Sequence, residues 1–216
     1  MRLRNNLLML GTSALLVSGL FAAIEPIVSN AATDTDDVIV NQSVTSEISL
    51  SSPSDITMTA LSTSQNSAVG SATWTVTTNN QAGYTLTLFA GAAPAMVRSG
   101  GGGNIADYTP SVAETPETWN TGSGTVEFGF SAFGTDVNTT TWGTDSDCIA
   151  GADVPSAALK WRDFDLTGSA DQIATAATAT TTSGTAATMC VATEQDTLFA
   201  QSGSYTATIT ATATTL

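Results

Sequence analysis

Three aspartates around a cysteine are the residues of this chain whose type and spacing best suit metal binding. Asp145 and Asp147 precede Cys148, and Asp153 follows it, in a polar stretch rich in turn-forming residues. Ca²⁺ takes six to eight oxygen ligands, which spaced carboxylates can supply. The pattern predicts a candidate Ca²⁺ site at Asp145, Asp147 and Asp153, with a solvated acidic loop as the alternative.

Three aromatic residues are the candidates for ligand binding. Tyr108 and Trp119 lie in residues 91–124, a stretch with three prolines, four consecutive glycines and no clear periodicity. Trp161 lies between Lys160 and Arg162, in a segment that continues with two aspartates. Exposed aromatic side chains mark recognition surfaces, and arginine stacks on flat rings. Tyr108, Trp119 and Trp161 are therefore candidate carbohydrate contacts, with packing on the domain edge and local ion pairs of Arg162 as the alternative.

Composition excludes several kinds of chemistry. The chain of 216 residues has no histidine and two cysteines, which rules out the usual zinc constellations and Ser-His-Asp or Cys-His catalysis. Glu127 and Asp163 do not form part of a marked carboxylate pair, so we expect no enzyme activity and assign no catalytic residue. Five basic against 19 acidic residues, a net charge of −14, argue against nucleic acid and anionic membrane partners.

The N-terminus predicts export. Arg2 and Arg4 precede a mainly apolar run, and small residues end at Ala31, so residues 1–31 fit a secretory signal peptide. An uncleaved membrane anchor is the alternative. Residues 32–37 form an acidic leader that we expect to be flexible. In an oxidising compartment, Cys148 and Cys190 are expected to form a disulfide, with two free thiols as the alternative.

The elements that must position these residues are strands. Apolar residues alternate with threonines from Trp74 to Leu88 around an Asn-Asn-Gln-Ala-Gly connection, which predicts a β-hairpin. Similar alternation occurs in residues 38–51, 56–60, 125–133 and 202–213, and residues 137–142 could form a short edge strand. The predicted core residues are Trp74, Val76, Tyr84, Leu86, Leu88, Phe128, Phe130, Tyr205 and Ile209.

These strands define the expected fold class. Short strands separated by Gly, Pro and Asn, without helical apolar spacing, predict an all-β protein. We expect one antiparallel β-sandwich of about eight strands over residues 38–216, with Greek-key, immunoglobulin-like connections. Residues 91–124 form a long loop insertion in this domain, and the signal peptide would precede it as a helix.

Two segments carry a resemblance to a known group of proteins. Residues 73–88 (TWTVTTNNQAGYTLTL) and 202–216 (SGSYTATITATATTL) resemble bacterial secreted surface β-sandwiches, including WxL-type wall-binding domains and pilin-like proteins. Val76 stands where the first Trp-x-Leu motif has leucine, and Ala211 stands at the place of the second tryptophan. The resemblance implies a secreted β-sandwich that works at the cell surface.

The expected function is a non-catalytic, extracellular structural or adhesive protein of a surface layer or fibre. Its expected partners are cell-envelope components or other copies of itself, and it meets a membrane only through an uncleaved signal. In one specific version, the segment from Val38 to Leu50 adds a strand to the sheet edge of a neighbour. The alternative is a secreted module that binds carbohydrate or Ca²⁺; no other cofactor is expected.

Overall fold

The computed structural model describes residues 33–216. The chain divides into two units, residues 1–43 and 44–216. In the first unit, residues 33–43 have no regular secondary structure and are exposed. The predicted signal peptide and its helix, residues 1–31, lie outside the described residues.

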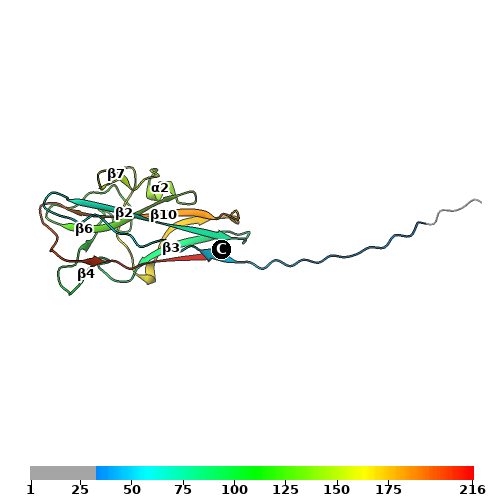
Figure 1. Ribbon diagram of the computed structural model, residues 1–216. Coiled ribbons are helices and arrows are strands. Elements are labelled where there is room, and N and C mark those ends of the chain that lie inside the picture. The colour runs from blue at the N-terminus through cyan, green and yellow to red at the C-terminus, as the bar shows by residue number, and fades with distance from the viewer. Residues whose placement is uncertain (1–32) are drawn as a thin grey trace, which may run out of the picture. The chain divides into compact units, whose positions relative to one another are not determined.

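The second unit is all-β, as expected. The strands of its two larger sheets are β1 (Ile48–Leu50), β2 (Ser67–Thr78), β3 (Tyr84–Ala90), β5 (Ala106–Asp107), β6 (Val126–Gly134), β9 (Asp171–Ala176), β10 (Thr185–Gln195) and β12 (Ile209–Thr215). The five-stranded sheet has the order β1-β2-β10-β6-β5, and the three-stranded sheet has the order β12-β3-β9. Figure 1 shows β2 and β10 in one layer and β3 in the other.

Smaller elements complete the unit. Strands β4 (Val97–Arg98) and β11 (Tyr205–Thr206) pair with each other, as do β7 (Ile149–Gly151) and β8 (Val154–Pro155). The one-turn helix α2 (Thr139–Trp142) and the 3₁₀ turn η1 (Thr167–Ser169) are the helical elements of the described residues. These residues contain twelve strands, so the expected count of about eight is not confirmed.

The predicted hairpin of residues 74–88 is wrong. Its two strands form, but β2 pairs with β1 and β10, whereas β3 pairs with β12 and β9 in the other sheet. The connection, residues 79–83, crosses from one sheet to the other and turns at Gly83, which has φ +88°. An added Cβ at Gly83 would lie 1.9 Å from the carbonyl oxygen of Ala176. Period-two alternation is the same for both arrangements, because either one turns both apolar faces toward one core.

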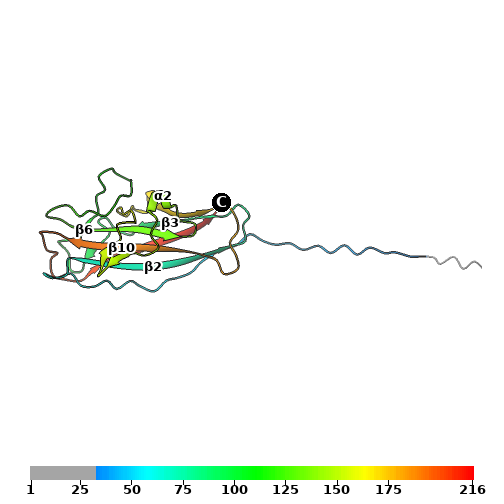
Figure 2. The same cartoon turned by 90° about the horizontal axis from the view of Figure 1, so that it is seen from above.

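The crossing between sheets recurs along the chain. The six strands of six or more described residues are β2, β3, β6, β9, β10 and β12, and they alternate between the five-stranded and the three-stranded sheet. Successive long strands therefore face each other across the core instead of pairing. In Figure 2, β2, β10 and β6 run side by side although other strands separate them in sequence.

The main core lies between the two sheets. Of the predicted core residues, seven are buried there: Trp74, Val76, Tyr84, Leu86, Leu88, Phe128 and Phe130. Tyr205 and Ile209 are half-buried and pack against the rim of this core. The apolar face of each strand is thus removed from water, which is the main favourable term in folding.

The five-stranded sheet is also covered on its other face. There, Cys190 and Ala192 of β10 and Val69 of β2 join a second buried cluster with Tyr108, Cys148, Leu159 and Trp161. Cys148 is bonded to Cys190, so the predicted disulfide is confirmed. It fastens the loop before β7 to the middle of the sheet.

Several segments that were predicted as strands or as a loop have a different secondary structure. Residues 137–142 contain α2 and no strand, because the Asn138 side chain caps the helix by accepting from Thr140 N–H. Residues 56–60 are not a strand, although Ile56 and Met58 pack on the main core. Strand β5 arises inside the loop insertion and pairs in parallel with β6, so the pairing is not wholly antiparallel. From residues 38–51, only Ile48–Leu50 forms a strand.

Reduction of Cys148–Cys190 is expected to lower the melting temperature without destroying the fold. The two cysteines are 42 residues apart, and closing a loop of that size contributes roughly 4 kcal/mol in the chain-entropy model. Thermal unfolding followed by circular dichroism, with and without reductant, measures the effect. The double variant C148A/C190A serves as a control and should melt like the reduced protein. An unchanged melting temperature with both thiols shown to be free would contradict this expectation.

Candidate functional site

The three predicted ligand-binding aromatics meet in one cluster. The rings of Tyr108 and Trp119 stack with centroids 4.6 Å apart, and Trp119 meets Trp161 edge-on at 5.4 Å. Tyr108 and Trp161 are 1 % and 0 % exposed, and Trp119 is half-buried. All three pack on the outer face of the five-stranded sheet beside the disulfide. Sequence spacing alone did not indicate that they meet.

The polar atoms of this cluster bond within the protein. Trp161 Nε1–H donates to the Ser156 carbonyl at 3.0 Å, and Trp119 Nε1–H donates to Glu194 Oε2 at 2.6 Å. The Tyr108 hydroxyl is placed to donate to Glu117 Oε1 at 3.2 Å. Burial, followed by the charge of Glu117, raises the pKa of Tyr108 above its usual range. A buried, hydrogen-bonded aromatic cluster holds a loop on a sheet. Ligand binding by Tyr108, Trp119 and Trp161 stays a prediction, and of the three only Trp119 is half-buried and not fully buried.

A glycine on β6 lets the aromatic cluster approach the sheet. A Cβ at Gly129 would lie 2.7 Å from the Arg162 carbonyl oxygen, 2.8 Å from Tyr108 Cβ and 3.0 Å from Trp119 Cζ3. The neighbouring β6 residue Phe130 pairs with Arg162 through two backbone hydrogen bonds of 2.8 and 2.9 Å. Tyr108, Trp119 and the backbone of Arg162 therefore pack directly on the backbone of β6.

The predicted Ca²⁺ ligands do not converge. Within residues 33–216, no group of three or more His, Cys, Asp or Glu side chains is placed to hold a metal ion. Asp145 accepts from the Ser156 hydroxyl and from Ser146 N–H, and these bonds lower the pKa of its carboxyl. Asp147 Oδ1 accepts from Ile149 N–H at 3.3 Å, and Asp153 lies at a turn with φ +61°. Asp145 and Asp147 thus bond to neighbouring loop residues, and in the described residues the three aspartates do not form one group of ligands.

Arg162 is the centre of the strongest electrostatic cluster. Its side chain is 8 % exposed, and its guanidinium contacts Asp171 at 2.7 Å, Asp165 at 2.9 Å and Asp163 at 3.7 Å. Glu114, from the loop insertion, also pairs with it. The local pairs with Asp163 and Asp165 were expected from sequence, whereas those with Asp171 and Glu114 were not. Because Asp171 begins β9 and Arg162 pairs with β6, this cluster links the two sheets and the insertion.

The most buried acid of this cluster is expected to titrate near neutral pH. Burial raises the pKa of Asp171 to about 7, although the charge of Arg162 opposes the shift. Asp165 and Asp163 raise it further because they are negative neighbours. Asp171 also accepts from the backbone N–H of Asp165 at 3.3 Å. One buried arginine with four carboxylates is a charge arrangement that costs stability as the last of these acids ionises.

A pair of glutamates was not singled out as a pair from the sequence. Glu127 on β6 lies directly opposite Glu194 on β10 and is buried. Burial raises the pKa of Glu127, a weak hydrogen bond from Gly122 N–H lowers it, and the charge of Glu194 raises it. Alternation correctly places Glu127 on the face opposite Phe128. The period does not show that the loop insertion covers that face.

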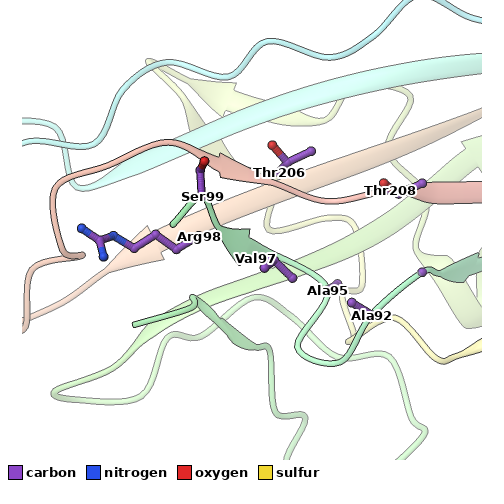
Figure 3. Close-up of a pocket in the computed structure, with 8 residues that line it drawn as sticks. Ala92, Ala95, Val97, Arg98, Ser99, Thr206 and Thr208 are labelled. Carbon is purple, nitrogen blue, oxygen red and sulfur yellow. The ribbon is translucent and has the colours of Figure 1, made fainter. Parts of the chain in front are cut away.

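An open pocket of about 510 Å³ lies beside the paired strands β4 and β11. Its lining consists of small residues, an arginine and hydroxyl groups: Gly91, Ala92, Ala95, Val97, Arg98, Ser99, Thr206 and Thr208. Figure 3 shows the Arg98 guanidinium turned away from Ala92 and Ala95, and it donates to the Ser202 carbonyl at 2.6 Å. The lining contains no carboxylate and does not indicate a particular ligand.

No protein-family model, curated protein or solved structure matches this chain at a significant level. From residue 33 onward, no helix is both long and apolar enough to cross a lipid bilayer.

Substituting Gly129 with alanine is expected to destabilise the domain by about 1–3 kcal/mol, as overpacking does in well-packed sites. The new methyl group would meet backbone and ring atoms that have little room to move. Chemical unfolding measures the loss, and tryptophan fluorescence reports the displacement of Trp119. The matched control is Gly168→Ala, since nothing lies within 4 Å of a Cβ there. Equal stability of the two variants would show that the cluster does not press on β6.

Replacing Asp171 with asparagine is expected to flatten the pH dependence of stability. With a folded pKa of about 7 against an ordinary value of 3.8, this group contributes stability that is fully present below about pH 4. That contribution is lost as pH rises through 7, because only the folded state still holds the proton. The free energy of unfolding, measured from pH 5 to 8, should therefore fall less in Asp171→Asn than in the parent.

The exposed Asp55→Asn is the control for this experiment and should keep the parent slope. The comparison uses slopes, since the loss of the contact with Arg162 can lower the stability of Asp171→Asn at every pH. Parallel curves for the parent and Asp171→Asn would contradict the assignment.

Proposed function

We propose that the protein is an exported, non-catalytic structural or adhesive component of a cell surface, and that it associates with other copies of itself or with cell-envelope components. The observation that carries this proposal is an unpacked aliphatic segment. Val38, Ile39, Val40 and Val44 are 80–87 % exposed. Such a run in water is a feature of interaction sites and is costly to leave uncovered.

Charge supports association through restricted surfaces. A net charge of −14 makes copies of the chain repel one another, and repulsion of this kind keeps proteins apart in dilute buffer. Residues 38–46 contain no charged side chain, and neither do residues 197–216. Contact through these stretches avoids placing like charges against each other. Salt that screens the remaining charges should favour association.

The proposal includes secretion of the protein. It also includes a relationship to bacterial secreted surface β-sandwiches, WxL-like or pilin-like. An immunoglobulin-like, Greek-key arrangement is the proposed classification of the fold. It is supported by two facing sheets between which the successive long strands alternate. The alternative role of carbohydrate or Ca²⁺ binding has less support. Tyr108 and Trp161 are buried, and the three aspartates do not converge in the described residues.

The test is the self-association of the exported protein. We expect sedimentation velocity to show larger species as concentration rises, with more of them at 0.5 M than at 0.05 M salt. The double variant Val38→Asp/Val40→Asp should lose this association, because it places charges on the exposed aliphatic face. Asn41→Asp adds a charge to the same segment at a polar position and should lose less. Purified protein that stays monomeric at high concentration and does not adhere to cell envelopes would contradict the proposal.

A further inference from the structure

Strand β12 is a sheet edge without the usual protection. It pairs with β3 on one side, and within residues 33–216 no backbone hydrogen bond joins its other side to a third strand. Natural edge strands are shielded by charges, proline, bulges or short length. Residues 209–215 (ITATATT) contain no charged residue and no proline, and they pair with β3 over seven positions without a register shift.

The other edges of the two larger sheets are short or covered. Strand β5 has two residues and β1 has three. Strand β9 begins with the ion-paired Asp171, and its outer side is met by the segment at Asp136, whose carbonyl accepts from Thr175 N–H. Strand β1 lies near β12, but the two belong to different sheets. Among the described strands, β12 is thus the long open edge.

The exposed segment matches this edge in length, pattern and charge. Val38–Val44 has seven residues, like β12, which corresponds to about 24 Å of extended strand. Val38, Val40 and Val44 occupy alternate positions and would share one face of a strand. On β12, Ile209, Ala211 and Ala213 share the half-buried face, and the threonines between them are exposed. Both partners are uncharged.

We propose that the open edge of β12 receives the segment Val38–Val44 of a second copy of this chain. This inference rests on the proposed function and specifies its contact. Main-chain hydrogen bonds would supply affinity, and the valines would cover the rim of the main core beside Ile209 and Ala211. The contact joins two different surfaces, so repetition forms an open chain of copies unless its rotation closes a ring.

Cysteine cross-linking between two distinguishable copies tests the contact. One copy carries Asn41→Cys or Ser43→Cys, and the other, enlarged by a fused tag, carries Thr212→Cys on the exposed face of β12. The native cysteines are already paired with each other. Mild oxidation should give a mixed disulfide of the tagged and untagged copies, at least fivefold above the controls, because residues 41 and 43 share the outward face in the proposed strand.

Two controls fix the geometry. Gln42→Cys lies on the opposite face of the same segment and should link poorly to Thr212→Cys, because neighbouring side chains of a strand point to opposite faces of the sheet. Thr73 is exposed on β2 in the other sheet, so Thr73→Cys should not link to any of them.

Charges on the edge provide a second test. The double variant Thr212→Lys/Thr214→Lys adds the charges that edge strands normally carry and should abolish association, whereas Thr73→Lys should not.

The outcomes separate this inference from the proposed function. Association without the Asn41 or Ser43 cross-link to Thr212 would overturn the β12 contact and leave the proposed function standing. A link that forms only within one doubly substituted chain would overturn it too, since the edge would then be covered by its own segment. A monomeric protein that forms no link and does not adhere to cell envelopes would overturn both.

Discussion

The structure depends on covering both faces of its five-stranded sheet. Strand β10 lies in the middle of that sheet, with Met189 and Val191 facing the main core and Cys190 and Ala192 facing the second cluster. The three-stranded sheet covers the first face. The second face is covered by loop segments, which need specific anchors because they have few ladder hydrogen bonds of their own. The disulfide, the stacked Tyr108 and Trp119 and the close approach at Gly129 are those anchors.

Much of this could be predicted from sequence, because period-two patterning depends on which face of a strand is buried. It located β2, β3, β6 and β12 and seven buried residues of the main core, whereas the cysteine pair followed from the predicted export. Pairing was not predictable in the same way. A hairpin and a crossing between sheets both turn the faces of Val76 and Leu86 inward, so the alternation does not choose between them.

The candidate sites show the same limit. Tyr108, Trp119 and Trp161 were selected for their chemistry, but their burial follows from the path of the insertion, which has no periodicity to reveal it. The pairing of Arg162 with Asp163 and Asp165 is local and was foreseen. Its contact with Asp171 joins two sheets and depends on the tertiary fold. The charge of this acidic chain is distributed unevenly. Four acids surround the buried Arg162, whereas residues 38–46 and 197–216 have no charged side chain.

The central claim is that this chain acts by strand pairing through those neutral stretches. Hydrogen exchange of backbone amides in dilute and concentrated protein tests it most directly, since new strand hydrogen bonds slow exchange where they form. The account predicts that residues 38–44 and β12 gain protection together as copies associate, while β10, already internal to its sheet, does not change. Protection gained at any other edge, or at neither segment when association is evident, would contradict it.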